Sequence, residues 1–132
     1  MDKKTKGTVA EMYVAAHLIE NGWRVAFPIG ENQQYDLIAE KEGRFVRIQV
    51  KYADPRKGAL IVNCRSSNNW SVLHYTKKEI DVIAAFNPQN KQIYFIPVKK
   101  INHSALNLRV DPLRNNQKLN IHLAENFKDI NF

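Results

Sequence analysis

The stretch from Tyr35 to Lys51 holds two runs of strand-forming residues on either side of the sequence Lys-Glu-Gly-Arg. A short segment with Glu-Gly at its centre is typical of a tight turn, so the two runs are predicted to form an antiparallel hairpin. The turn pairs Lys41 with Arg44. Continuing the ladder back from there places Asp36 opposite Gln49. A slip of one residue would move every side chain of a strand to the other face, so this register constrains the fold strongly.

The second strand of this hairpin alternates apolar and polar residues, which is the pattern of a strand with one buried face. The buried face is predicted to carry Val46, Ile48 and Val50, and the other face Arg47, Gln49 and Lys51. Directly paired residues share a face, so Asp36 is predicted to stand beside Gln49 and diagonal to Lys51. An acid, an amide oxygen and a cation are the groups that a metal-dependent site for cleaving phosphodiester bonds requires.

The charge balance favours a polyanionic partner. The chain has 132 residues, of which 20 are Lys or Arg and 13 are Asp or Glu, so its formal net charge is +7. On a chain of single-domain length, this excess favours nucleic acid over a membrane surface. No stretch approaches the roughly 20 apolar residues of a membrane span, and the first residues lack the apolar run of a signal peptide. A cytoplasmic protein without a membrane partner is therefore expected.

Cysteine and histidine usage argues against several classes of site. The single cysteine, Cys64, excludes an internal disulfide framework and is predicted to be a small buried residue. The four histidines, at positions 17, 74, 103 and 122, have no second ligand at zinc spacing. No Gly-rich loop matches a nucleotide cradle, and no spacing supports a Ser, Cys or His nucleophile.

Residues 5–21 are predicted to form an amphipathic helix that ends at the stop signal Asn21-Gly22. Its apolar positions are 9, 12, 16 and 19, together with 14, 15 and 18. Glu11 shares a stripe with the second set, at helical spacings of three, four and seven residues, so its carboxylate is predicted to lean toward the protein. The alternative is an edge residue paired with a lysine.

Residues 59–65 and 70–75 are predicted to be the strands of a second hairpin, joined by a turn at 66–69. This ribbon would carry Arg65, Trp70, His74 and Tyr75. Such a ribbon can enter a major groove and contact base edges and phosphates. An ordinary sheet with a few polar side chains facing outward is the alternative, and these residues alone leave it open.

Thr76 is predicted to cap a helix that runs from Lys77 to about Phe86. Its inward stripe would consist of Ile80, Ile83 and Ala84, with Asp81 as a surface or capping charge. The remaining predicted strands are 23–27 and 92–98, with strand-like runs at 106–110 and 120–123. Residues 28–34 and most of the Asn- and Gln-rich tail are predicted to be loop.

Four motifs in this order resemble the PD-(D/E)XK nuclease superfamily, and more closely the small endonucleases encoded in bacterial and cyanobacterial group I introns. The motifs are Gly7 to Glu11 in the first helix, the loop Phe27-Pro28-Ile29-Gly30-Glu31-Asn32, then Tyr35-Asp36-Leu37 and Gln49-Val50-Lys51. Segments 80–84 and 93–97 are also similar to that group, so the resemblance covers roughly residues 5–100.

Two residues depart from the superfamily pattern. Tyr35 stands where the superfamily has Pro, which leaves the expected site intact. Gln49 replaces the usual second acid, so the site holds one negative charge fewer and offers a neutral oxygen to a hard cation that prefers carboxylates. The number of bound metal ions is therefore open, although the intron-encoded group is similar to this chain in having Gln at that position.

The resemblance implies a fold and a site. The fold is an α/β (mixed α+β) restriction-endonuclease-like core, with a central mixed sheet flanked by helices. Residues 1–132 would form one endonuclease domain, with a C-terminal extension at 104–132. The catalytic residues would be Glu11, Asp36, Gln49 and Lys51. Mg²⁺, for which Mn²⁺ could substitute, would be held by Asp36, Gln49, the backbone carbonyl of Val50 and Glu11 acting through water.

The implied activity is site-specific, Mg²⁺-dependent double-strand cleavage of DNA by an intron-encoded homing endonuclease. The expected partners are double-stranded DNA at a long target site and further copies of the chain, as a homodimer or homotetramer. Candidate DNA contacts are Arg56, Lys57, Arg65, Trp70, His74 and Lys77, with Lys3, Lys4, Lys6 and Lys78 as further phosphate contacts. A Holliday junction resolvase and a non-catalytic DNA-binding module are the alternatives.

Overall fold

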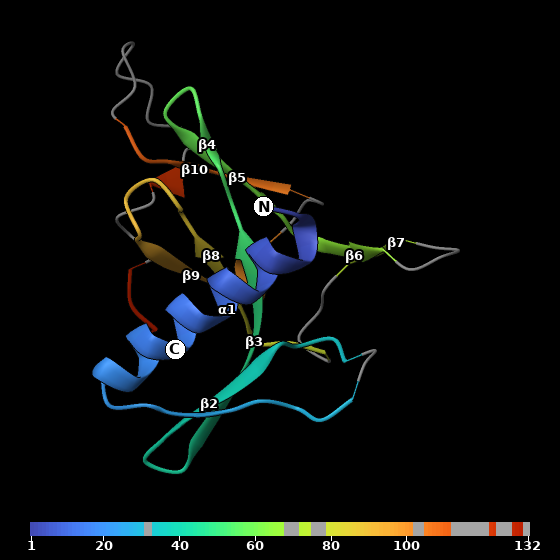
Figure 1. Ribbon diagram of the computed structural model, residues 1–132, viewed down its shortest axis with the longest axis vertical. Coiled ribbons are helices and arrows are strands. Elements are labelled where there is room, and N and C mark those ends of the chain that lie inside the picture. The colour runs from blue at the N-terminus through green and yellow to red at the C-terminus, as the bar shows by residue number, and fades with distance from the viewer. Residues whose placement is uncertain are drawn as a thin grey trace.

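A central five-stranded mixed sheet with a single long helix across one face organises the protein (Figure 1). The computed structural model describes residues 1–30, 33–67, 72–74, 79–101, 105–111, 122–123 and 128–130. The helix α1 spans Lys3–Glu20. The sheet order is β1 (Arg24–Ala26), β2 (Leu37–Lys41), β3 (Arg44–Tyr52), β8 (Val82–Phe86) and β9 (Ile93–Pro97). No helix in these ranges is long and apolar enough to cross a membrane.

Capping groups define both ends of α1. The Asp2 side chain accepts a hydrogen bond from the Thr5 N–H at 2.8 Å and so satisfies one of the donors left open at the first turn. The helix ends at Asn21, and the following Gly22 has a φ of 88°, which is easily reached only without a Cβ. The predicted stop at Asn21-Gly22 is confirmed.

Only one of the two predicted apolar stripes of α1 faces the core. Ala10, Val14 and Leu18 are fully or almost fully buried against β2, β3 and β8. The other stripe lies on the outside, with Met12 49% and Ile19 60% exposed. The predicted helix is confirmed, but apart from Val9, which packs against the core, its first set of apolar positions is not buried, because the helix contacts a single layer of sheet.

The predicted hairpin is confirmed, and its register holds for residues 37–41 against residues 44–48. β2 and β3 pair antiparallel with Lys41 opposite Arg44 and Leu37 opposite Ile48. The paired residues end at Leu37, and the Asp36 N–H donates at 2.8 Å to the carbonyl of Ile48, the partner of Leu37, so the predicted direct pairing of Asp36 with Gln49 is not part of this ladder. The predicted alternation also holds, since Val46, Ile48 and Val50 are buried beneath α1 whereas the intervening side chains are only partly buried.

The predicted helix at 77–86 is wrong where the structure describes it, because Val82–Phe86 form strand β8. All five residues of β8 are buried, and the strand pairs parallel with β3 and antiparallel with β9. A central strand with both faces covered has a continuous apolar run, which periodicity alone cannot distinguish from a buried helix. The proposed cap Thr76 lies outside the described residues.

Asp81 joins the start of β8 to β3 by several hydrogen bonds, so it is not merely a surface charge. Its carboxylate accepts from the Arg47 N–H at 2.9 Å and from the Arg47 guanidinium at 3.2 Å. In return, the Asp81 N–H donates to the Arg47 carbonyl at 2.9 Å. These bonds set the parallel register in which Gln49 pairs with Ile83.

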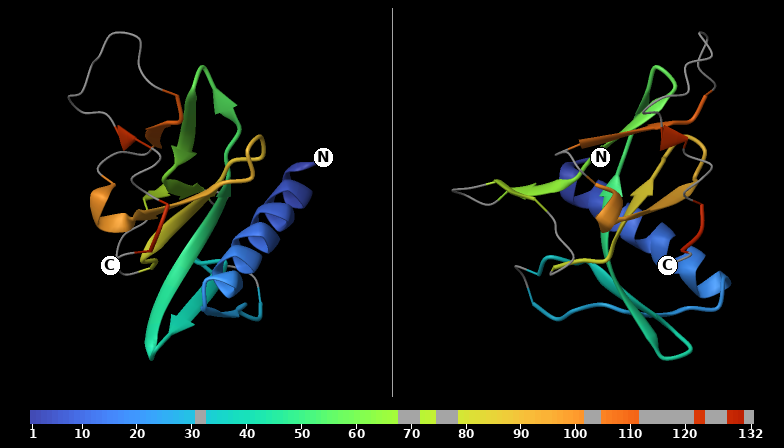
Figure 2. Two further views of the ribbon diagram at one scale, coloured as in Figure 1. Left: turned by 90° about the vertical axis from the view of Figure 1, so that its left-hand side faces the viewer. Right: turned by 180° about the vertical axis from the view of Figure 1, so that it is seen from behind.

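A second layer of strands covers the other face of the central sheet (Figure 2). Its sheet has the order β11 (His122–Leu123), β10 (Ala105–Arg109), β5 (Ala59–Asn63) and β4 (Pro55–Arg56). Leu60 and Leu108 from this layer pack with Ile83 and Ile96 in a second core. The expected mixed α/β core with a central mixed sheet is confirmed, and in the described part of the chain that sheet is covered by one helix on one face and by a second sheet on the other.

The predicted second hairpin is present only in part, because residues 59–63 of its first strand form β5 in the second sheet and residues 66–67 of its predicted turn are strand. β6 (Arg65–Ser67) and β7 (Val72–His74) pair antiparallel, with Arg65 directly opposite His74. The short η1 helix (Val98–Lys100) follows β9. Cys64, between β5 and β6, is buried as predicted, and burial raises the pKa of its thiol to about 11.

Replacing Asp81 with Ala should lower the free energy of unfolding by about 1–3 kcal/mol, because it leaves the Arg47 N–H and guanidinium without this acceptor. Urea denaturation measures the change. The exposed Asp54 is the control, and Asp54→Ala should change stability by less than about 0.5 kcal/mol. Equal effects of the two substitutions would contradict the anchoring role of Asp81.

Candidate active site

The Asp36 side chain lies at the point where β2 begins, beside the middle of β3. Its carboxylate accepts a hydrogen bond from the Val50 N–H at 2.8 Å. The side chain is partly buried. Burial raises the pKa of Asp36, although the Val50 hydrogen bond and the charge of Lys51 oppose that rise.

Glu11 reaches this position from α1. Its carboxyl group lies within hydrogen-bonding reach of Asp36, and burial together with the negative charge of Asp36 raises the pKa of Glu11. The prediction that Glu11 leans toward the protein is therefore confirmed in its geometry. The alternative of an edge residue paired with a lysine is not what the structure shows.

Gln49 and Lys51 lie on the face of β3 that is turned away from α1, and both are partly buried. Burial lowers the pKa of Lys51, while the nearby Asp36 carboxylate acts in the opposite direction. Desolvation is the larger of these two effects on the pKa of Lys51. Lys51 lies close enough to Asp36 for a direct electrostatic interaction, which brings cation and acid into one site.

The donor set fits a divalent cation. Two neighbouring carboxyl groups share one partly buried space, where burial raises the pKa of both and Asp36 further raises the pKa of Glu11, so a cation could replace the proton between them. Hard cations such as Mg²⁺ take carboxylate, amide and carbonyl oxygens, all of which are present at Glu11, Asp36, Gln49 and Val50. The site contributes two carboxyl groups and neutral oxygens. It is therefore not a cluster of three or more His, Cys, Asp or Glu side chains, and none of that kind that could hold a metal is found within the described ranges.

The structure describes only some of the residues that were predicted to contact DNA. Arg56 and Lys57 are exposed on β4 and the turn after it, and the Lys57 carbonyl accepts from Arg109 at 3.0 Å. Arg65 and His74 face each other in the backbone ladder of the β6–β7 ribbon. Trp70, Tyr75, Lys77 and Lys78 lie outside the described residues. Lys3 and Lys4 are exposed at the start of α1, and the Lys6 ammonium lies 5.5 Å from the Tyr52 ring centroid.

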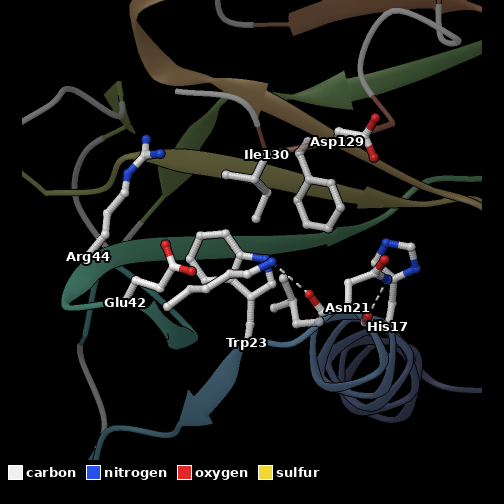
Figure 3. A pocket seen from close by; sticks show the side chains of 10 residues that line it. His17, Asn21, Trp23, Glu42, Arg44, Asp129 and Ile130 are labelled. Atoms are coloured by element: carbon white, nitrogen blue, oxygen red, sulfur yellow. Dashed lines mark hydrogen bonds between the residues drawn. The ribbon is translucent and has the colours of Figure 1, made fainter.

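A cavity of about 320 Å³ lies at the other end of α1 (Figure 3). It is lined by His17, Leu18, Asn21, Trp23, Lys41, Glu42, Arg44, Phe95, Asp129 and Ile130. The Lys41 ammonium crosses it to donate to the Asn21 carbonyl at 3.0 Å and lies over the Trp23 ring. None of the predicted catalytic residues lines this cavity, so it is separate from the candidate site.

Sequence reasoning missed the contribution of Arg47 and Asp81. Arg47 lies two residues before Gln49 on the same face of β3, and its ion pair with Asp81 borders the site. The signal that was available is the alternation itself, which placed Arg47 on the polar face. The sequence did not reveal Asp81 as its partner, because residues 81–86 were assigned to a helix.

Replacing Glu11 with Gln should stabilise the metal-free protein at neutral pH. A carboxyl group with a raised pKa contributes stability that is present below its unfolded value, 4.5 for Glu11, and lost as pH rises through the folded value. The difference in unfolding free energy between variant and parent should therefore grow as pH rises from about 4 to 7. Urea denaturation in EDTA measures it.

The exposed Glu20 provides the control for that experiment, since Glu20→Gln should change the free energy of unfolding by less than about 0.5 kcal/mol. Adding Mg²⁺ should stabilise the parent more than Glu11→Gln, because a ligand that binds only the folded state stabilises it. A pH-independent effect of Glu11→Gln would contradict the proximity of the two acids.

The fold is similar to that of a bacterial homing endonuclease, I-Ssp6803I, with a TM-score of 0.79 and 22% sequence identity over 97% of this chain and 89% of that one. A Holliday junction resolvase from Archaeoglobus fulgidus matches with a TM-score of 0.49 and 18% identity over 79% and 84% of the two chains.

The sequence comparisons identify the family. No curated protein matches the chain. The model of the PD-(D/E)XK endonuclease family matches residues 1–130. The mixed five-stranded sheet with α1 is the restriction-endonuclease-like fold, which this chain shares with the bacterial homing endonuclease. The chain therefore belongs to the PD-(D/E)XK endonuclease family.

Proposed function

We propose that the protein is a site-specific DNA endonuclease of the homing type, which makes Mg²⁺-dependent double-strand breaks by hydrolysing phosphodiester bonds. The observation that carries this proposal is the meeting of Glu11, Asp36 and Lys51 at the middle of the sheet. Asp36 interacts electrostatically both with Glu11, with which it forms an acid pair suited to a cation, and with Lys51, whose ammonium is suited to a phosphate.

Asp36 is the central metal ligand in this proposal, with Glu11 acting through water and with the oxygens of Gln49 and Val50 completing the set. Mg²⁺ bound there would supply positive charge to the reacting phosphate and lower the pKa of a bound water. The Val50 N–H holds one oxygen of Asp36 in place, so the carboxylate orientation is fixed before a ligand binds. Gln49 adds an oxygen without a second full charge.

Lys51 stabilises the negative charge that develops on the phosphate oxygens and orients the attacking water. Its partial burial removes competing water from around the ammonium and strengthens its interaction with a phosphate. The pKa of Lys51, which burial lowers, also favours a role in accepting a proton from that water. Both roles require Lys51 on the same side of β3 as Gln49.

The substrate we propose is duplex DNA with a long recognition site. The net charge of +7 supports binding to phosphates, and the ribbon that pairs Arg65 with His74 has a shape suited to a groove. One chain carries one such site, whereas a duplex break requires cleavage of two strands. We therefore propose that the active form is a homodimer or homotetramer.

Replacing Lys51 with Ala should lower the cleavage rate by at least about a hundredfold while leaving DNA affinity nearly unchanged, because the ammonium acts on the reacting phosphate. Single-turnover cleavage and a filter-binding titration at fixed salt measure the two quantities. The exposed Lys99 is the control, and Lys99→Ala should retain cleavage. Asp36→Asn should also abolish cutting. Parallel loss of binding and cleavage in Lys51→Ala would contradict this assignment.

The substrate class is tested by incubating the protein with a randomised duplex library and Mg²⁺, then sequencing the cut ends. A long sequence recurring at the cut ends is expected. Preferential cutting of four-way junctions over linear duplex would instead indicate a resolvase. Absence of cleavage by a protein that still binds DNA would indicate a non-catalytic binding module. Replacing Mg²⁺ with Mn²⁺ should preserve cleavage, and Ca²⁺ serves as a comparison.

A further inference from the structure

The outer face of α1 carries an apolar stripe that the core does not use. Its exposed residues are Met12, Ala16 and Ile19, and Val9 at its edge is partly buried and also packs against the core beneath α1. Figure 2 shows α1 as the layer on the outside of the sheet. The buried residues Ala10, Val14 and Leu18 lie on the opposite side of the helix, so the stripe is a separate apolar surface and not an extension of the core.

The spacing of this outer stripe is three, four and three residues. That is the strict repeat of two positions per seven residues by which one helix packs along another, and it is narrower than the face of a helix buried on a sheet. A small residue, Ala16, lies between Met12 and Ile19 and would let two helix backbones approach closely. The pattern therefore fits a helix as its partner.

The charges beside the stripe favour a second α1 running in the opposite direction. In an antiparallel pair, Met12 of one copy packs against Ala16 of the other, and Val9 against Ile19. The flanking positions on one side are Lys6, Tyr13 and Glu20, which place Lys6 of each copy near Glu20 of the other. The Lys6 ammonium, which lies over Tyr52 in the single chain, is on a flexible stem that can turn to this carboxylate. In this arrangement the dipoles of the two helices would also be antiparallel, which is electrostatically favourable.

We propose that the outer stripe of α1 is the contact through which two copies of this chain form an antiparallel dimer. This inference rests on the proposed function in one respect, since it supplies the second active site that duplex cleavage requires. Glu11 projects from the same helix, so the pairing would also fix the two active sites relative to one another.

The length of the helix bounds the strength of this dimer. An 18-residue helix is about 27 Å long, which accommodates two repeats of the stripe. Two such repeats bury less than the roughly 1,600 Å² of a standard interface. A dimer that dissociates in the micromolar range is therefore expected, and it would assemble further on DNA.

Sedimentation equilibrium of the full chain without DNA tests the proposal. Ile19→Lys and Met12→Lys should each raise the dimer dissociation constant by about tenfold or more, because each places a charge in the apolar contact between the two outer stripes. Both side chains are exposed in the single chain, so the fold should be kept, which circular dichroism checks. Phe45, which is 68% exposed on β3, is the matched control, and Phe45→Lys should leave the constant unchanged.

The orientation of the helices is tested by charge exchange and by cross-linking. Lys6→Glu and Glu20→Lys should each weaken the dimer, and the double variant should recover it. In a Cys64→Ala background, a mixture of Met12→Cys and Ala16→Cys chains should form a disulfide-linked pair faster than either variant alone. Faster cross-linking within either single variant would overturn the antiparallel arrangement.

The outcomes separate this inference from the proposed nuclease function, because dimerisation is measured without DNA and without Mg²⁺. A monomer at all concentrations, or a dimer broken by Phe45→Lys and not by Ile19→Lys, would overturn the interface. Loss of cleavage in the parent protein would overturn the nuclease function alone. If both proposals hold, Ile19→Lys should convert double-strand breaks into single-strand nicks at low protein concentration.

Discussion

The hydrogen bond from the Val50 N–H to the Asp36 carboxylate is the interaction on which the candidate site depends. Asp36 precedes the first residue of β2. Its side-chain carboxylate therefore accepts the hydrogen bond that a backbone carbonyl of a paired strand would otherwise accept from the Val50 N–H. The same bond holds the acid beside Gln49 and Lys51. A change of register between β2 and β3 would break it and would also expose the buried faces of both strands.

The hairpin could be predicted from the sequence because two independent signals agreed. The Glu-Gly turn set the pairing, and the alternation of Val46, Ile48 and Val50 set the faces. Glu11 could be placed for the same reason, since helical spacing determines the direction of a side chain without knowledge of its partner. Local periodicity was sufficient for the parts of the site that lie on one helix and one hairpin.

The central strand β8 could not be predicted in this way. Its five residues are apolar on both sides because one face packs beneath α1 and the other against the second sheet. Only the tertiary arrangement distinguishes such a run from a buried helix. The role of Asp81 could not be predicted either, since its partner Arg47 is 34 residues away in the chain. Contacts of this separation leave no local pattern.

The position of β8 between the two cores has a consequence for how the protein unfolds. Val82, Ala84 and Phe86 belong to the core beneath α1, whereas Ile83 and Ala85 belong to the core beneath the second sheet. A strand that forms one wall of both cores cannot leave one without leaving the other. The helical layer and the second sheet are therefore mechanically coupled, and strain applied to one of them, by DNA or by a partner chain, reaches the other through a single strand of five residues.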